Sequence, residues 1–235
     1  MVDIVLKGPG KNALGTPVMQ QALEDFRAAR GEPVLLRGDG DTFSAGLNLK
    51  EIAMLDPDGL TKFLSLFDEL VVQILTHDAP VVACVNGHAI AGGCVLMLAC
   101  DLRVAAAKPS SRIGLNEVAI GLVFPPRVLR LAESRLAPSH LSRVLLEAGL
   151  YSPAESYRLG LVHEVADDAE AASRALLAKL AESPRHAYVE TKRELNRPSV
   201  ELSEREVAAF RERVLPMWTS PDLRQTIAMA LMKRA

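Results

Sequence analysis

Short β-rich runs alternate with amphipathic helical stretches through the first half of this 235-residue chain, and no other feature limits the possible folds as strongly. The run Val2 to Leu6 is followed by apolar residues at helical spacing that end near Gly31, and a buried run from Val34 to Leu36 comes next. Thr16 and Pro17 are expected to start the helix, with the Thr16 hydroxyl as its cap. This alternation is typical of βαβ-type units and a largely parallel sheet.

The rest of the chain becomes progressively more helical. Helical spacing over 60–75 is followed by expected strands at 80–85 and 102–106, with an apolar helix between them that ends at Ala99. From about Pro125 onward strands become scarce, and the expected helices are 152–159, 169–181, 184–195, 202–215 and 222–233. Because no repeat or low-complexity linker divides the chain, we expect one α/β fold with a helical C-terminal layer.

The composition is that of an ordinary soluble globular protein, with 49% hydrophobic residues, 24% charged residues and a net charge of −2. It offers no basic stripe for nucleic acid. Cys84, Cys94 and Cys100 match no common zinc or redox spacing, so we expect reduced core residues and no metal site. Asp3 and Lys7 interrupt the only candidate N-terminal apolar segment, and no run is long enough to span a bilayer. The expected location is therefore the cytoplasm.

The stretch Ala91-Gly-Gly-Cys94 stands between a buried strand and a buried helix. Two adjacent glycines let a substrate oxygen approach the backbone closely, and the free N–H groups of a first helical turn face that oxygen with the positive end of the helix dipole. The pattern indicates oxyanion binding, and a tight, closely packed turn is the alternative. A phosphate loop is excluded because the glycine spacing and the lysine that it needs are absent.

Two more stretches carry candidate chemistry. The loop Phe43 to Lys50 offers a second set of N–H groups after a strand, and two donors from separate loops can hold one carbonyl oxygen. The apolar run Ile113 to Pro126 contains a single acidic residue, Glu117. An unpaired buried carboxylate is costly, so Glu117 must be paired, exposed to solvent, or kept with a raised pKa that suits proton transfer. A surface role and a catalytic role for Glu117 therefore both stay open. His88 and Asp101 are expected to be structural, as a hydrogen-bonded turn residue and as a strand-start or capping carboxylate.

In order and spacing these stretches resemble the crotonase, or enoyl-CoA hydratase/isomerase, superfamily. The segments that carry the resemblance extend over nearly the whole chain and are Asn12–Leu14, Phe43–Lys50, Asn86–Cys94, Cys100–Arg103, Gly114–Glu117, Ser152–Glu155 and Gly160–Val162. The resemblance implies a spiral of β-β-α turns, an acyl-CoA substrate with no further cofactor, and assembly as trimers or dimers of trimers. Residues 1–185 would form the crotonase-like core, and 186–235 a helical segment used for oligomerisation.

The resemblance also implies which residues form the site. It places the oxyanion hole on the backbone N–H groups of Leu47 and Gly92, and it implies further substrate contacts from residues near them, namely Ser44, Ala45, Gly46, Lys50, Gly93 and Phe124. Lys50 is the nearest cation for the CoA phosphates, ahead of Lys192, Arg193 and Lys233-Arg234, although each also fits an ordinary solvated charge. The segment 123–125 either walls the acyl pocket and keeps water away, or simply begins a helix.

Hydratases of this family carry two glutamates, and the position of the first is Val95 in this sequence. Only Glu117 remains. A lone base can take a proton from C2 of a 3-enoyl thioester and return it to C4 while the hole holds the dienolate. The residue sequences of Phe43–Leu49 and Ile113–Glu117 also look like those of the Δ3,Δ2-enoyl-CoA isomerase branch. Isomerase is therefore the expected function.

Two rival functions stay open. Decarboxylation, carbon–carbon cleavage or thioester hydrolysis would keep the same enolate and use other pocket groups, because a family resemblance indicates the intermediate better than the reaction. A catalytically silent acyl-CoA-binding subunit would need only the fold, and Val95 permits it. The presence of Glu117 beside an intact Gly92-Gly93 argues against the silent subunit.

Overall fold

The chain builds a five-stranded sheet in the order β1-β2-β3-β5-β7, and each neighbouring pair is parallel. The computed structural model describes residues 1–218, 220, 221, 223 and 227. The strands are β1 (Val2–Leu6), β2 (Val34–Gly38), β3 (Val81–Val85), β5 (Leu102–Ala106) and β7 (Glu164–Ala166). The first four confirm the expected strands, whereas the short edge strand β7 was not expected.

A second, smaller sheet lies beside the first. Its strands β4 (Ala89–Ile90) and β6 (Ile113–Gly114) pair in parallel, and single bridges extend it at Leu14–Leu47, Ser44–Ala89 and Ile113–Tyr151. The chain therefore passes from a strand of the large sheet to a position in the small one and then to a helix, turn after turn. This is the expected β-β-α spiral, and it brings the three loops with candidate site residues side by side.

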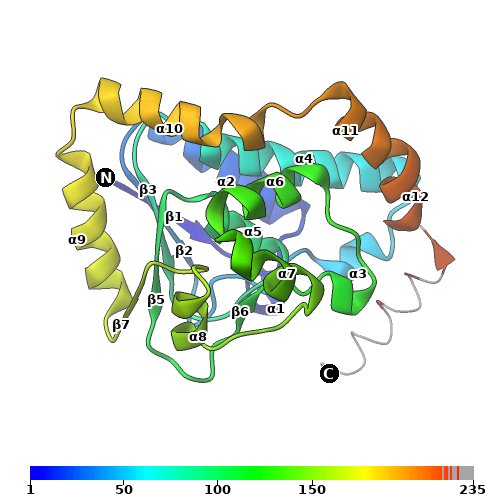
Figure 1. Ribbon diagram of the computed structural model, residues 1–235, viewed down its shortest axis with the longest axis horizontal. Coiled ribbons are helices and arrows are strands. Elements are labelled where there is room, and N and C mark those ends of the chain that lie inside the picture. The colour runs from blue at the N-terminus through cyan, green and yellow to red at the C-terminus, as the bar shows by residue number, and fades with distance from the viewer. Residues whose placement is uncertain (219, 222, 224–226, 228–235) are drawn as a thin grey trace.

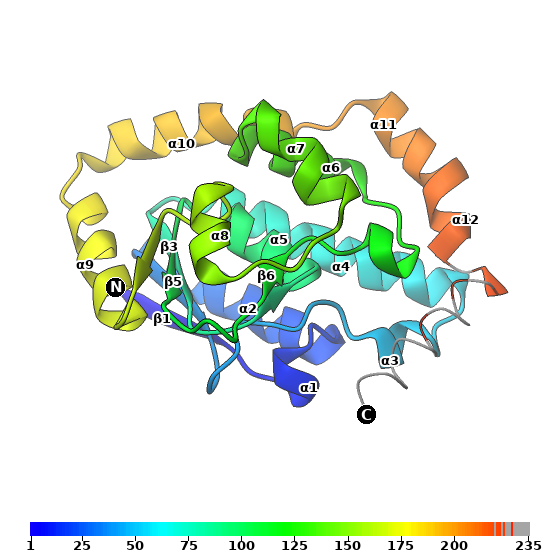
Figure 2. The same cartoon turned by 60° about the horizontal axis from the view of Figure 1, so that its bottom comes forward.

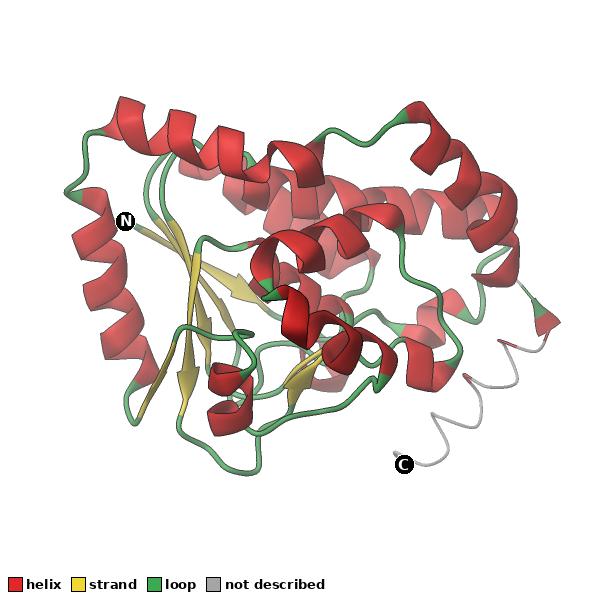
Figure 3. Ribbon diagram, viewed as in Figure 1, coloured by secondary structure: helices red, strands yellow, loops and turns green. Residues whose placement is uncertain are grey.

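Helices cover both faces of the large sheet, as Figures 1 and 3 show. The helices α2 (Thr16–Ala29), α4 (Pro57–Leu75) and α5 (Gly92–Ala99) bury their apolar residues in the main core. On the opposite face α9 (Ala169–Ala181) packs its Leu177 against a smaller cluster from β2, β3 and β5. The shorter helices of the first two thirds of the chain are α1 (Pro9–Asn12), α3 (Leu49–Ile52), the 3-10 helix η1 (Val118–Ile120), α6 (Pro126–Arg135), α7 (Pro138–Leu146) and α8 (Pro153–Arg158).

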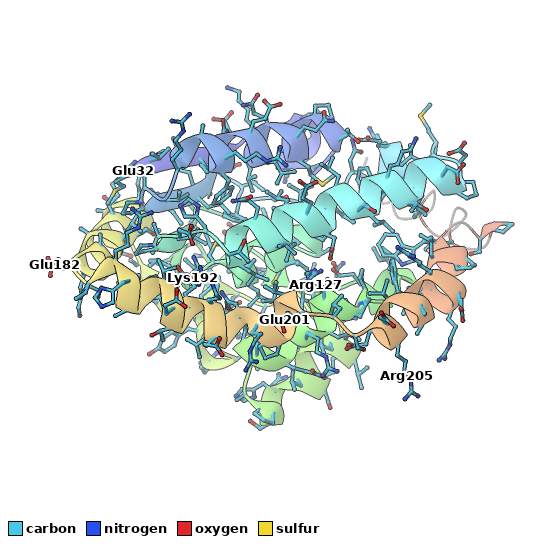
Figure 4. The ribbon with its side chains drawn as sticks, turned by 90° about the horizontal axis from the view of Figure 1, so that it is seen from above. Glu32, Arg127, Glu182, Lys192, Glu201 and Arg205 are labelled. Atoms are coloured by element: carbon cyan, nitrogen blue, oxygen red, sulfur yellow. The ribbon has the colours of Figure 1, made fainter. Side chains whose placement is uncertain are left out.

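The C-terminal layer consists of α10 (Arg185–Val200), α11 (Glu204–Ala209), the π-helical turn η2 (Phe210–Val214) and α12 (Leu215–Trp218). In Figure 4, α10 lies alongside α4. Hydrogen bonds hold α10 to its own chain, since the Asn196 amide donates to the Leu75 carbonyl and the Lys192 ammonium donates to the Ala79 carbonyl. This helix is therefore fastened to the rest of the chain through buried polar side chains.

Several expectations about helices need correction or confirmation. Thr16 does not cap α2, because Gly15 takes the cap position and the Thr16 hydroxyl bonds to the Glu51 carboxylate. The expected helix 202–215 is interrupted by the π-turn, and the expected helix 222–233 falls almost entirely outside the described residues. The helices expected at 152–159 and 169–181 are confirmed. No helix in the described part of the chain is long and apolar enough to cross a membrane.

Candidate active site

The loop after β2 and the start of α5 are in direct contact. The Ser44 N–H donates to the His88 carbonyl at 2.9 Å, and the Ile90 N–H donates to the Ser44 carbonyl at 3.0 Å. The contact is so close that a Cβ atom on Gly93 would lie 2.6 Å from the Ser44 oxygen, and one on Gly46 would lie 2.7 Å from the Ile90 oxygen. Glycine at positions 46 and 93 is therefore a requirement of this loop contact.

The contact brings two backbone donors from separate loops close together. A Cβ atom on Gly92 would lie 3.4 Å from the Leu47 nitrogen, so the two residues are neighbours although they belong to separate loops. Over residues 1–218, neither the Leu47 N–H nor the Gly92 N–H has a hydrogen-bond acceptor. Ala91, with φ 50° and ψ −122°, adopts a strained conformation directly before α5. Two free N–H groups from neighbouring loops are able to bind one oxyanion if they point to the same atom.

Glu117 lies at the end of the loop after β6, directly before η1. Its side chain is buried, with 6% exposed, which rules out the surface role that the sequence left open. Its backbone carbonyl accepts the N–H groups of Ile120 and Leu122, and its Oε2 has no hydrogen-bond partner among the described atoms. Burial raises the pKa of this carboxyl group to about 8, close to the pH at which a protein base operates.

Glu117 and the two N–H donors line the same small cavity, of about 40 Å³. Its other walls come from α4, α5, α6, α12 and the loops between them, namely Ala45, Leu49, Leu64, Phe67, Ile90, Ala91, Val95, Asn116, Ile120, Leu122, Pro125, Val128 and Trp218. Within this lining, Glu117 is the only ionisable side chain. Val95, which the family resemblance places where hydratases carry their first glutamate, lies in the same cavity. An adjoining groove of about 540 Å³ shares the walls Leu64, Phe67, Pro125 and Val128.

The other residues expected to contact a substrate separate into two groups. Ala45 lines the cavity, whereas Ser44, Gly46 and Gly93 lie behind it and hold the two loops together. The buried Ser44 hydroxyl donates to the Asn12 carbonyl at 2.8 Å and accepts the Gly46 N–H. These residues therefore shape the donors without facing the cavity.

Phe124 is not brought to Glu117. It is buried along a different groove, which it shares with Leu129 and Met217, and the cavity wall is formed by Ile120, Leu122 and Pro125 instead. The expected contact of Phe124 with the acyl part of a substrate stays a prediction.

The candidate phosphate-binding cations have different surroundings. Lys50 is exposed on α3, one turn beyond the Leu47 donor, and is free of ion pairs in the described structure. Lys192 is buried and paired with Asp101 at 3.0 Å, so it is not available to a phosphate. Arg193 pairs with Glu190 on the surface, and Lys233-Arg234 falls outside the described residues.

The expected structural residues are confirmed. His88 accepts the Arg112 N–H through Nδ1 at 3.1 Å. Asp101 precedes β5 and accepts the Val81 N–H at 2.8 Å. The three cysteines are free and buried. The described residues contain no group of three or more His, Cys, Asp or Glu side chains placed to hold a metal ion.

Two cavity residues were missed by the sequence analysis. Trp218 reaches the cavity from α12, about a hundred positions beyond Glu117, and no local pattern connects the two. Asn116 also lines the cavity, and its Oδ1 is buried without a partner among the described atoms. Its position next to Glu117 in a loop was the only available signal.

Known proteins resemble this chain over most of its length. A family model described as "Enoyl-CoA hydratase/isomerase" matches residues 1–234. The chain belongs to this family. Among curated relatives, "Enoyl-CoA delta isomerase 1, mitochondrial" of mouse is 31% identical over 80% of this chain and 67% of its own length, and "Crotonyl-CoA hydratase" of Syntrophomonas wolfei is 27% identical over 68% and 62%. The matches thus span about two thirds of these relatives.

Solved structures of the enoyl-CoA hydratase/isomerase family share the fold. Human mitochondrial delta3-delta2-enoyl-CoA isomerase superposes with a TM-score of 0.90 at 24% identity, covering 98% of this chain and 93% of the human one. An enoyl-CoA hydratase from Bacillus halodurans gives 0.84 at 23% identity, covering 97% and 95%. The resemblance to the crotonase superfamily and its isomerase branch is confirmed, and the α/β spiral with it.

Proposed function

We propose that this protein is an acyl-CoA isomerase that moves a 3-enoyl double bond to the 2-position, with Glu117 as its single acid/base. One observation carries the proposal. Glu117 is the only ionisable side chain among the described residues that line the cavity, its Oε2 is unpaired there, and Val95 occupies the place of a second glutamate. One base beside an oxyanion site suits a proton shift and does not suit the paired chemistry of hydration.

The proposed reaction follows from the positions of these groups. The thioester oxygen accepts hydrogen bonds from the N–H groups of Leu47 and Gly92. The ionised Glu117 removes a proton from C2, and the electrons of that C–H bond form a dienolate whose negative charge rests on the bound oxygen. Glu117 then returns the same proton to C4, and the double bond forms between C2 and C3. Protons and electrons balance without water, so no cofactor is needed beyond the CoA of the substrate.

The apolar surroundings of Glu117 support this single-base reaction. Val95, Leu122 and Trp218 offer no group that activates or orients a water molecule. The same surroundings raise the pKa of Glu117 by desolvation, which gives the carboxylate the basicity to attack a C–H bond. A hydratase would have to add a second proton-transfer group at this place.

The CoA part of the substrate would lie on the side of Lys50. This exposed lysine follows the Leu47 donor by three residues, at the start of α3, and its ammonium is free to bind a phosphate.

We further propose a trimer or dimer of trimers, as the family resemblance implies. Exposed apolar side chains on α6 and α7, Leu129 and Leu146, suit contact with another subunit, and light scattering after size exclusion measures the assembly directly.

A paired assay tests the proposed activity. Purified protein is given a 3-enoyl-CoA and, separately, a 2-enoyl-CoA, and both double-bond migration and hydration are followed. We expect isomerisation without hydration, and a loss of about 100- to 10,000-fold in the Glu117→Gln variant, the range that a general base contributes. Glu182→Gln, an exposed residue at the far end of the molecule in Figure 4, is the matched control.

Each result has a definite meaning. Isomerisation that survives in Glu117→Gln would remove Glu117 from the mechanism. Hydration at a rate comparable to isomerisation would contradict the single-base assignment. No turnover of either substrate by the parent protein would overturn the proposal in favour of another enolate reaction or of a silent acyl-CoA-binding subunit.

A further inference from the structure

Trp218, the only tryptophan of the chain, lines the cavity of Glu117 from the end of α12. Its side chain is buried, with 4% exposed, and its indole N–H donates to the Val123 carbonyl at 3.1 Å. Both the contact with the cavity and the hydrogen bond to Val123 are therefore made by a residue that lies beyond α10. The C-terminal layer therefore contributes directly to the site.

The segment that leads to Trp218 has few anchors of its own. From Val200 to Met217 no residue is buried, although α11, η2 and most of α12 lie in this stretch. Figure 2 shows α11 and α12 continuing from α10 around the outside of the molecule and back toward α4. Grooves of about 540 and 590 Å³ run along the segment, and Phe210 lines both. Trp218 is thus the first buried side chain of this segment after α10.

Trp218 donates its hydrogen bond to a part of the active-site loop that makes few other backbone hydrogen bonds. Within the described residues, the N–H groups of Val123 and Phe124 have no hydrogen-bond acceptor. The preceding residue, Leu122, donates to the Glu117 carbonyl at 2.9 Å. A short chain of contacts therefore runs from the indole through Val123 and Leu122 to the backbone of Glu117.

We propose that Trp218 is a positioning residue that seals the Glu117 cavity against water and holds the loop carrying Glu117 in place. This inference rests on the proposed function, since it assigns Trp218 a part in the same proton shift. The indole supplies the apolar wall, and its N–H supplies the link to the loop. Among the described residues after α10, Trp218 alone lines this cavity.

Removing the wall has a predictable electrostatic effect. No other ionisable side chain lines the cavity in the described structure. The titratable group of α5 that interacts with Glu117 is the Cys94 thiol, whose own pKa is raised by burial so that it stays neutral. The Asp68–Arg127 pair of α4 and α6 lines the adjoining groove instead. The basicity of Glu117 is therefore set mainly by exclusion of water, and opening the cavity lowers its pKa toward the ordinary value.

The test compares Trp218→Phe and Trp218→Ala with the parent protein and with Met217→Ala, an exposed neighbour on the same helix. We expect Trp218→Ala to lose about tenfold or more in kcat/KM for a 3-enoyl-CoA, since small displacements of a catalytic group are costly. The pH at which its kcat/KM is half-maximal should fall by about one unit or more. Trp218→Phe keeps the wall without the N–H, so it should lose activity with little change in that pH. Met217→Ala should match the parent.

Two results would overturn the inference. Parental kcat/KM in both Trp218 variants would show that the indole does not position Glu117. A loss in Trp218→Ala with an unchanged pH profile and a lowered melting temperature would assign Trp218 a purely structural role. A side chain that only stabilises the fold changes the melting temperature when it is removed, but it does not shift the pH profile of kcat/KM.

Fluorescence of the parent protein tests the placement of Trp218 separately. Because the chain has one tryptophan, its emission comes from this site alone. Octanoyl-CoA, which cannot be isomerised, should change the emission, whereas CoA without an acyl chain should not. If the parent lacks isomerase activity but shows this response, the proposed function fails and the placement of Trp218 stands. If octanoyl-CoA leaves the tryptophan emission of an active parent enzyme unchanged, the placement of Trp218 at the cavity would be overturned.

Discussion

Gly93 and Ser44 are packed so closely that a Cβ atom on Gly93 would lie 2.6 Å from the Ser44 carbonyl oxygen and 2.8 Å from the Ser44 Cβ. The oxygen cannot give way easily, because it already accepts the Ile90 N–H. The Ser44 side chain is fixed as well, since its hydroxyl donates to the Asn12 carbonyl. This contact sets the distance between the loops that carry the Leu47 and Gly92 donors.

The first prediction concerns Gly93→Ala. The added methyl group would push the two loops apart, so the Leu47 and Gly92 N–H groups would no longer converge on one oxygen. We expect kcat/KM for a 3-enoyl-CoA to fall about 100- to 1000-fold, as for loss of an oxyanion donor. Overpacking would also lower the free energy of unfolding by about 1–3 kcal/mol. Steady-state kinetics and denaturant unfolding measure the two effects.

A matched glycine substitution serves as the control. Gly40 has a φ of 69° and no atom within 4 Å of the place of its Cβ, so Gly40→Ala carries a backbone cost without a clash. The free energy of unfolding of Gly40→Ala should fall by about 1–2 kcal/mol, while its kcat/KM stays parental. A Gly93→Ala protein that is folded and as active as the parent would refute the role assigned to this contact.

The second prediction is a pH profile. In the proposed reaction Glu117 acts as a base only when it is ionised, and burial raises its pKa to about 8. The kcat/KM for isomerisation should therefore rise with pH, reach half of its maximum near pH 8 and then level off, since kcat/KM reports the free enzyme. Kinetics in a constant-ionic-strength buffer series from pH 5.5 to 9.5 measures this. A profile that is flat from pH 6 upward would mean that Glu117 is already ionised there.

The third prediction concerns stability. The carboxyl group of Glu117 has an ordinary pKa of 4.5 in the unfolded chain and one of about 8 in the folded protein. Between these values the folded state binds more protons, so its stability falls as the pH rises and levels off above pH 8. Glu117→Gln removes this dependence. Its gain in unfolding free energy over the parent should grow from pH 5 to pH 9, up to about 5 kcal/mol in the limit of full burial.

Thermal unfolding of both proteins across this pH range measures the difference. Glu182→Gln, which changes an exposed carboxylate, should show no such growth. Parallel curves for the parent and Glu117→Gln would mean that Glu117 titrates with the same pKa in the folded and unfolded states.

The parts of the fold that follow from short-range pattern were predicted well. The strands Val2–Leu6 and Leu102–Ala106 agree in both bounds because each is a short, mostly apolar run that pairs in the sheet. The helix Ala169–Ala181 also agrees, since Asp168 caps it at one end and its alanine-rich interior favours helix throughout. Glu117 stood out for a related reason, as the lone charge inside an apolar run.

Features that depend on distant parts of the chain were not accessible in this way. The helical period over 202–215 is real, yet the helix is interrupted by a π-turn that points Phe210 into the grooves on either side. Thr16 has the residue type of a cap, but the Glu51 carboxylate competes for its hydroxyl. Trp218 meets Val123 across 95 residues, a contact that no local pattern encodes.

A final prediction concerns the ion pair that fastens α10 to the sheet. Lys192 is buried, with 6% exposed, and lies 3.0 Å from Asp101, which also accepts the Val81 N–H and the Tyr188 hydroxyl. Removing one partner leaves the other charge buried without a counter-charge. Asp101→Asn and Lys192→Met should therefore each lower the free energy of unfolding by about 3–5 kcal/mol.

The double variant Asp101→Asn/Lys192→Met should be less destabilised than the sum of the two single variants, because no unpaired charge remains. Folded protein of every variant should keep parental kcat/KM, since neither residue lines the Glu117 cavity. Urea unfolding of the four proteins completes the double-mutant cycle. Strictly additive losses would show that the two side chains contribute independently, and that other contacts such as the Asn196 hydrogen bond to Leu75 hold α10 instead.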